Sequence, residues 1–189
     1  MQPPRLKRKH LRAPLRTEFL YNSDGYALKG RVINISEGGI LLSELPQIPP
    51  INAIPIIVEM PEYPDFQKLG TERILKLRKE AIGRRVVRMR AAIVRSFEGK
   101  TEVEKVFVTN IGCKFVNPPV ELINEIRDYV SLFARNTIYL LQLFESMGKS
   151  QTQRDVLRQI SSFLGYDHTE KIAILRQKVL HDYQSLESL

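Results

Sequence analysis

Apolar and polar side chains alternate between residues 17 and 115, in short runs that turn-forming residues separate. The run over 84–96 shows this most clearly, because its odd positions from Val87 to Ile93 are apolar and arginines occupy several even positions. Since successive side chains of a strand point to opposite faces, this period predicts one buried and one exposed face. Six short antiparallel strands predict a small barrel or sandwich. We place them over 17–21, 26–35, 40–43, 53–60, 84–96 and 103–115.

Turn and break signals lie between these strands. Turns are expected over 22–25 and 37–39, because glycine and short polar residues support the backbone conformations that turns need. Residues 98–100 are predicted to form the hairpin before the last strand. The polar stretch 71–81 is expected to be a short helix or irregular, within an insert over 61–81 whose role the sequence leaves open.

The period changes after Asn117, which two prolines follow. Beyond this point apolar side chains recur at spacings of three, four and seven, which is typical of amphipathic helices. We therefore predict a mainly β fold with an α extension, namely a β domain with a basic N-terminal arm over 1–117 and a helical extension over 118–189. The predicted helices cover 120–147, 151–164 and a third segment that Asp167 or Thr169 caps and that runs to about Leu186.

The first helix carries an apolar stripe that is nearly in heptad register. Two interpretations remain open: the helices pack on one another and on the β domain, or they form a homo-oligomer with a second copy. The stripe consists of Phe133, Leu140, Phe144 and Met147.

The distribution of charge along the chain is consistent with an anionic partner. The 189-residue chain has a net charge of +8, and residues 1–117 carry 21 of its 29 Lys and Arg but 12 of its 21 Asp and Glu. Such a basic part favours a nucleotide, nucleic acid, acidic protein or membrane surface, although solubility alone explains it equally well. No apolar run approaches the roughly 20 residues of a membrane span, and no secretory signal is evident. We expect a cytoplasmic protein.

The basic arm contains the spacing R-x-x-x-R at Arg8 and Arg12, and again at Arg12 and Arg16. Its prolines and like charges favour an extended or loosely ordered segment. A guanidinium is a planar fork of donors that grips phosphate oxygens, stacks on a base or reaches O6 and N7 of guanine. Two arginines four residues apart could therefore clamp a ligand that offers both phosphates and guanines. Lys7 and Lys9 are further possible contacts, although a solvated positive field is the simpler explanation for them.

The turn near residue 37 contains the pattern N-x-S-x-x-G at Asn34, Ser36 and Gly39. Asn34 and Ser36 lie two residues apart, so they point to the same side of an extended strand, where an amide and a hydroxyl can bond a base edge. Gly39 is expected to permit a sharp turn and the close approach of a ligand. Gly38 is a possible contact beside it. Taken alone, the pattern is equally typical of a polar hairpin.

With both motifs present, residues 5–117 resemble the PilZ family of cyclic di-GMP receptors, and the strand over 110–115 is similar to the family's last barrel strand. The matching residues are Arg8 and Arg12 for the R-x-x-x-R motif, and Asn34, Ser36 and Gly39 for the [D/N]-x-S-x-x-G motif. Pro14 follows at the spacing common in the family, which favours this pair of arginines over Arg12 and Arg16. Asn34 is neutral, so we expect it to hold guanine N–H groups less strongly than an Asp would.

The resemblance implies a six-stranded antiparallel β-barrel and non-enzymatic binding of cyclic di-GMP, with no cofactor and no metal. The arm would wrap over the ligand, and the changed surface would act on a downstream protein partner that controls motility, exopolysaccharide or biofilm formation. The resemblance also implies that a basic residue before Arg8, here Lys7, favours the binding of a pair of ligands over a single ligand. Two alternatives stay open. One is a PilZ-like adaptor that binds no ligand. The other is a nucleic-acid-binding barrel, which is less favoured because the strands lack an evident cluster of exposed aromatics for base stacking.

The sequence gives only weak signals for a metal site or a catalytic site. The three histidines and Cys113 lack the spacing of metal ligands, and no catalytic triad, phosphate loop or carboxylate pair stands out, so we do not expect an enzyme. Cys113 falls on the apolar side of its strand and is predicted to be a core residue. The stretch 73–95 contains nine Lys and Arg. It is either the exposed face of a strand with a solvated insert, or a surface for nucleic acid or an acidic partner.

Overall fold

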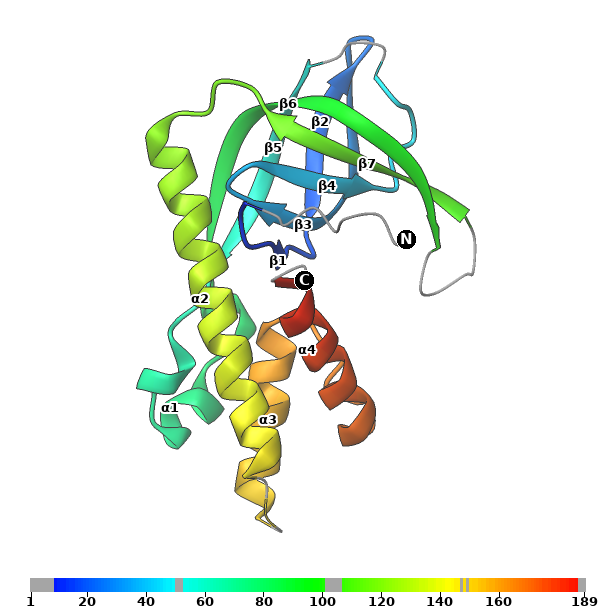
Figure 1. The fold of residues 1–189 in the computed structure, drawn as a ribbon. Helices are drawn as coiled ribbons and strands as arrows, with labels where there is room; N and C mark the ends of the chain where they lie inside the picture. Colours follow the sequence, from blue (N-terminus) through cyan, green and yellow to red (C-terminus); the bar gives the residue numbers. More distant parts are fainter. Residues whose placement is uncertain (1–8, 50–52, 101–106, 147, 149, 187–189) are drawn as a thin grey trace. The chain divides into compact units, whose positions relative to one another are not determined.

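The structure is a computed structural model that describes residues 9–49, 53–100, 107–146, 148 and 150–186 (Figure 1). The chain divides into two compact units. We call Pro14–Met60 with Arg84–Asp128 the barrel unit, and Met1–Ala13, Pro61–Gly83 and Tyr129–Leu189 the helical unit. The predicted boundary after residue 117 marks the place where strands give way to helices.

The strands of the barrel close into a ring. They pair in the order β1-β3-β2-β5-β6-β7-β4, and β4 pairs with β3 as well. This second pairing joins the two ends of the sheet, so β2 to β7 form a six-stranded barrel and β1 lies beside β3. The predicted antiparallel barrel is thereby confirmed. The strands are β1 (Ala13–Pro14), β2 (Glu18–Ser23), β3 (Tyr26–Ser36), β4 (Gly39–Ser43), β5 (Ala53–Glu62), β6 (Gly83–Lys100) and β7 (Phe107–Phe115).

The alternating pattern fills the barrel with apolar side chains. Along β5, every even position from Ile54 to Met60 is buried, while Pro55 and Glu59 are exposed. The predicted alternation of β6 is confirmed from Val87 to Ala91, where the odd positions are buried, whereas Ile93 is half-buried just before a register shift. Burial of apolar surface is the main favourable term in folding, so these inward faces stabilise the ring. Fully buried members of the core include Leu15, Phe19, Ile35, Leu42, Ile54, Ile56 and Ile111.

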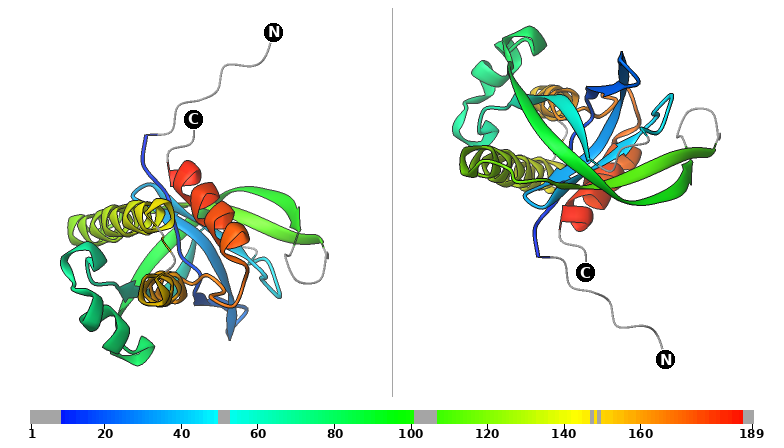
Figure 2. Two further views of the ribbon diagram at one scale, coloured as in Figure 1. Left: turned by 90° about the horizontal axis from the view of Figure 1, so that it is seen from below. Right: turned by 90° about the horizontal axis from the view of Figure 1, so that it is seen from above.

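The structure contains the turn predicted over 22–25 but not the hairpin predicted over 98–100. Asp24 and Gly25 both have positive φ, 51° and 83°, and Ser23 pairs with Tyr26 across them, so the first hairpin is confirmed. The hairpin predicted over 98–100 is wrong, because β6 continues through these residues and Lys100 pairs with Phe107. β6 and β7 therefore form a longer ribbon than expected (Figures 1 and 2), and their connection lies outside the described residues.

The helical unit contains the insert and the C-terminal helices. α2 begins in the barrel unit, and its residues from Tyr129 onward belong to the helical unit. In Figures 1 and 2, α3 lies between α1 of the insert and α4. Of the two forms expected over 71–81, a short helix or irregular structure, the structure contains the helix over the first six residues. The elements are η1 (Phe66–Lys68), α1 (Thr71–Lys76), η2 (Lys79–Ala81), α2 (Val120–Glu145), α3 (Gln151–Phe163) and α4 (Ile172–Leu186).

Asn136 holds the insert to the helices. Its side chain is fully buried on α2, where its Oδ1 accepts a hydrogen bond from the Phe66 N–H over 3.0 Å and its Nδ2 donates to the Pro64 carbonyl over 2.9 Å. Phe66 also stacks on Phe163 of α3, with ring centroids 5.6 Å apart. The insert, whose role the sequence left open, therefore completes the core of the helical unit.

The described part of the near-heptad stripe, which lies on α2, is buried. Phe133 and Leu140 are fully buried and Phe144 is nearly so, while Met147 lies outside the described residues. Because these side chains already pack inside the chain, the stripe does not offer an exposed surface for a second copy. Packing of the helices within the chain is the interpretation that the structure favours.

The start of the last helix differs from the prediction. Gly165, with a φ of 86°, follows the end of α3, which is the usual place for a glycine in the left-handed region. Asp167 Oδ1 then accepts hydrogen bonds from the N–H and the hydroxyl of Thr169, which lowers the pKa of the Asp167 carboxyl. These two residues form a local turn. Neither caps α4, which begins at Ile172.

The described residues contain neither a candidate membrane-spanning helix nor a candidate metal site. None of the helices within these ranges is both long and apolar enough to cross a membrane. In the same part of the chain, no three His, Cys, Asp or Glu side chains gather in a way that could hold a metal ion.

Candidate functional site

The N-x-S-x-x-G pattern lies on the β3–β4 hairpin of the barrel unit. Ser36 and Gly39 form the last pair of the ladder, and residues 37 and 38 make the turn between them. Asn34 is paired with Leu41 two positions earlier. The structure therefore brings the turn residues of the predicted site together at one end of one hairpin.

A β-bulge decides which way Asn34 faces. The register shifts between Val32 and Asn34, so Ile33 has no partner on β4, and its carbonyl instead accepts the Leu15 N–H over 3.0 Å. Val32 is buried before the bulge and Ile35 after it. Strict alternation from Val32 would have directed Asn34 into the barrel, so the extra residue turns Asn34 outward. Asn34 is half-buried.

Gly39 is required for a reason that the sequence did not reveal. Its backbone does not have a positive φ, so the expectation that it permits a sharp turn is wrong. A Cβ at this position would lie 2.1 Å from the carbonyl oxygen of Cys113 on β7. Only glycine fits so close to a neighbouring backbone. Gly39 therefore closes the contact between β4 and β7 beside the turn.

Ser36 stabilises the turn through a side-chain hydrogen bond to Gly39. Its hydroxyl donates a hydrogen bond to the Gly39 carbonyl over 3.3 Å, and only 6% of the residue is exposed. A hydroxyl that donates still has lone pairs with which to accept. Ser36 can thus accept from a ligand without losing its bond to Gly39.

An ion pair links the turn to α2. Arg127 Nη2 lies 2.6 Å from Glu37 Oε2, and its Nη1 donates to Asn124 Oδ1 over 3.0 Å. The neighbouring carboxylate raises the pKa of Arg127. Sequence reasoning missed this contact because the two residues are 90 positions apart and no local pattern connects them.

The arm is only partly described. Lys7 and Arg8 lie outside the described residues, Lys9 is exposed and Arg12 is half-buried. The Arg12 N–H donates to the Leu186 carbonyl at the end of α4 over 3.2 Å, a contact within the helical unit. The arm up to Ala13 belongs to the helical unit and the turn to the barrel unit. The structure therefore assembles the turn, and the predicted meeting of arm and turn stays a prediction.

Cys113 is a core residue, as predicted. Only 5% of it is exposed, and burial raises the pKa of its thiol to about 11. A thiol with such a pKa is almost entirely protonated near neutrality and makes a poor nucleophile.

Comparison with known proteins places these features in a family. The family model "PilZ domain" matches residues 6–132. Among curated proteins, no relative matches. Similar solved structures include the inhibitor of motility MotI/DgrA of Bacillus subtilis, with 14% identity over 72% of this chain and 57% of that one, and a TM-score of 0.49. The match thus spans little more than half of that protein's length.

Two further structures are similar at the same modest level. The PilZ domain of YcgR from Escherichia coli with c-di-GMP has 17% identity, covers 66% of this chain and 90% of that one, and gives a TM-score of 0.43. The K. pneumonia MrkH complex with c-di-GMP has 12% identity, 66% and 51% coverage, and a TM-score of 0.42. The assignment rests on the family match, which covers well over half of the sequence: this chain belongs to the PilZ domain family.

Proposed function

We propose that this protein is a cytoplasmic, non-enzymatic receptor for cyclic di-GMP that passes a signal to a protein partner. The observation that carries the proposal is the β3–β4 hairpin, on which the half-buried Asn34 and the buried Ser36 lie two residues apart beside the turn, in a chain of the PilZ family. Asn34 and Ser36 would bond a guanine edge, and Gly38 and Gly39 would leave room above the turn. Two of the similar structures are complexes with this nucleotide.

Arg8 and Arg12 would supply the opposing half of the site. The Leu15 N–H is bonded to the carbonyl of Ile33, the residue before Asn34. Arg12 is three residues upstream of Leu15, and three extended residues span at most about 11 Å. The covalent chain therefore limits how far the Arg12 backbone can lie from Ile33. The Arg12 guanidinium could clamp phosphate or guanine.

The arm also offers a route for the signal. Ala13 and Leu15 are fully buried, so the chain is anchored just after Arg12. Arg12 is bonded through its N–H to Leu186 at the end of α4. A ligand that holds the Arg12 side chain would favour one arrangement of this contact over another, and so shift the population of α4 conformations. The altered surface would then be recognised by the partner.

Calorimetry with cyclic di-GMP tests the assignment of the arginines. Arg8→Ala and Arg12→Ala should each weaken binding at least tenfold, because each removes a charged fork that neutral side chains cannot replace. Arg16→Ala, which removes the same charge four residues downstream, should change affinity less than threefold. Unchanged affinity in both of the first two variants would refute the arm assignment. Ligand-dependent amide exchange at the end of α4, lost in Arg12→Ala, would test the proposed route.

A further inference from the structure

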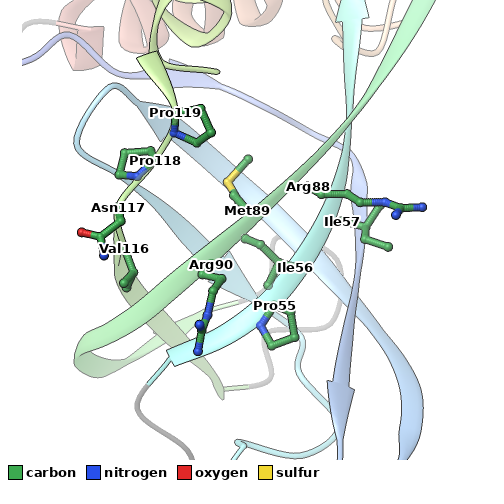
Figure 3. Close-up of a pocket in the computed structure, with 10 residues that line it drawn as sticks. All are labelled: Pro55, Ile56, Ile57, Arg88, Met89, Arg90, Val116, Asn117, Pro118 and Pro119. Carbon is green, nitrogen blue, oxygen red and sulfur yellow. The ribbon is translucent and has the colours of Figure 1, made fainter. Parts of the chain in front are cut away.

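A pocket lies in the barrel unit away from the turn motif, and both outward-facing residues and the buried Ile56 and Met89 line it. It has a volume of about 470 Å³ and is bounded by β5, β6 and the loop that follows β7 (Figure 3). None of the residues from Asn34 to Gly39 lines it. In Figure 3, Arg88 extends beside Ile57, Arg90 lies near Pro55, and the loop forms the opposite wall.

Arg88 and Arg90 of β6 line this pocket and differ in their pairing from the two arginines earlier on the strand. Arg84 and Arg85 of the same strand are paired with Glu59 and Glu125, over 3.2 and 2.9 Å, and neither lines the pocket. Within the part of the chain that the structure describes, Arg88 and Arg90 have no carboxylate partner, and both are exposed. They are two residues apart on a strand, so both side chains lie on its outer face.

Apart from Asn117, the other residues that line the pocket are apolar, and they include Ile56 of β5, Met89 of β6 and Val116 of the loop. Pro55 and Ile57 of β5 contribute its inner side, and Pro118 and Pro119 contribute the loop wall. Asn117, just before these prolines, has a φ of 46°, which an asparagine adopts more readily than most residues. Flat proline rings and an aliphatic side chain bounded by two guanidinium groups match a ligand with an apolar centre and negative flanks.

We propose that this pocket binds an acidic segment of a partner protein, in which an aromatic or aliphatic side chain is flanked by carboxylates. The apolar side chain enters between the β5 residues and the prolines, and the carboxylates pair with Arg88 and Arg90. Nucleic acid fits less well, because the pocket has no aromatic ring on which a base could stack. This inference goes beyond cyclic di-GMP binding and does not depend on it.

The test uses the full chain and a fluorescein-labelled peptide, Asp-Glu-Phe-Leu-Glu-Asp, followed by fluorescence polarisation. We expect saturable binding that weakens as salt rises, because the pairs involve exposed charges. A peptide with Lys at the four acidic positions, and one with Ser in place of Phe and Leu, should each bind at least tenfold more weakly. The first tests the charge and the second the apolar centre.

A matched pair of double variants locates the site. Arg88→Ala with Arg90→Ala should weaken peptide binding at least tenfold. Arg84→Ala with Arg85→Ala removes the same charge from the same strand outside the pocket, and should change the affinity less than threefold. Equal loss in both variants would show a diffuse charge effect and overturn the proposal. Failure of the peptide to saturate at millimolar concentration, or stronger binding of a single-stranded oligonucleotide to the same arginines, would overturn it as well.

Discussion

Arg127 on α2 holds the carboxylate of Glu37, with Nη2 and Oε2 2.6 Å apart, and Glu37 occupies the turn between Ser36 and Gly39. The pair neutralises the only carboxylate within the N-x-S-x-x-G motif. This matters because the proposed ligand carries two phosphates, which an unpaired carboxylate nearby would repel.

Removal of Arg127 should therefore weaken cyclic di-GMP binding indirectly. We expect Arg127→Ala to reduce the affinity three- to tenfold at low salt and less at high salt, since salt screens exposed charges. Calorimetry at two salt concentrations measures this. Adding Glu37→Gln to the Arg127→Ala variant should restore the affinity, because the repelling charge is then gone. An affinity that does not respond to Arg127→Ala would show that Glu37 has no influence on the ligand.

Gly39→Ala should destabilise the barrel. The added Cβ would meet the Cys113 carbonyl at 2.1 Å, so β4 and β7 would have to separate. Overpacking of this kind costs about 1–3 kcal/mol or more. The control is Gly70→Ala, where a Cβ would meet no atom within 4 Å, and where we expect a loss of no more than about 1 kcal/mol. Urea unfolding compares the two, and equal midpoints would contradict the close approach.

Asn136→Leu should destabilise the helical unit. The substitution leaves the buried Phe66 N–H and Pro64 carbonyl without partners, and each such loss costs about 1–3 kcal/mol. Asn124→Leu on the same helix is the matched control, because Asn124 is exposed, and its effect should stay within about 0.5 kcal/mol. Thermal unfolding of both variants provides the measurement. A stable Asn136→Leu protein would mean that the insert is held by other contacts.

Ionisation of the Cys113 thiol should make the free energy of unfolding depend on pH in the alkaline range. Burial raises the pKa of the thiol from its ordinary value near 9 to about 11, so the folded protein binds its proton more tightly than the unfolded chain does. The contribution is complete below about pH 9 and is lost as the pH rises toward 11. The free energy of unfolding of the wild type should thus fall more steeply over this range than that of Cys113→Val. Parallel pH profiles would exclude this origin.

Most of the fold could be predicted from local patterns, because alternation and helical periodicity are properties of neighbouring residues. Burial of Val87 and Met89, or of Phe133 on α2, follows from them directly. The remaining features depend on contacts between distant residues. The bulge at Ile33 reflects register against β4, and β6 extends past the turn signal at Gly99 because β7 continues to pair with it.

The candidate site divides in the same way. The motif spacing was sufficient to place Asn34 and Ser36 on one hairpin, because both lie within six residues of its turn. It could not show that Gly39 is selected by the carbonyl of Cys113, or that Arg127 reaches the turn from α2. Both depend on how the ring of strands closes, which no single segment specifies.

The central claim is that this member of the PilZ family binds cyclic di-GMP, and the most direct measurement is calorimetric titration of the wild-type protein with that nucleotide. We predict saturable heat with a dissociation constant in the micromolar range or below, at a defined stoichiometry of one or two ligands per chain, and no comparable heat with GMP. Absence of heat from cyclic di-GMP, with a folded protein by circular dichroism, would contradict the claim and leave an adaptor that acts through protein contacts alone.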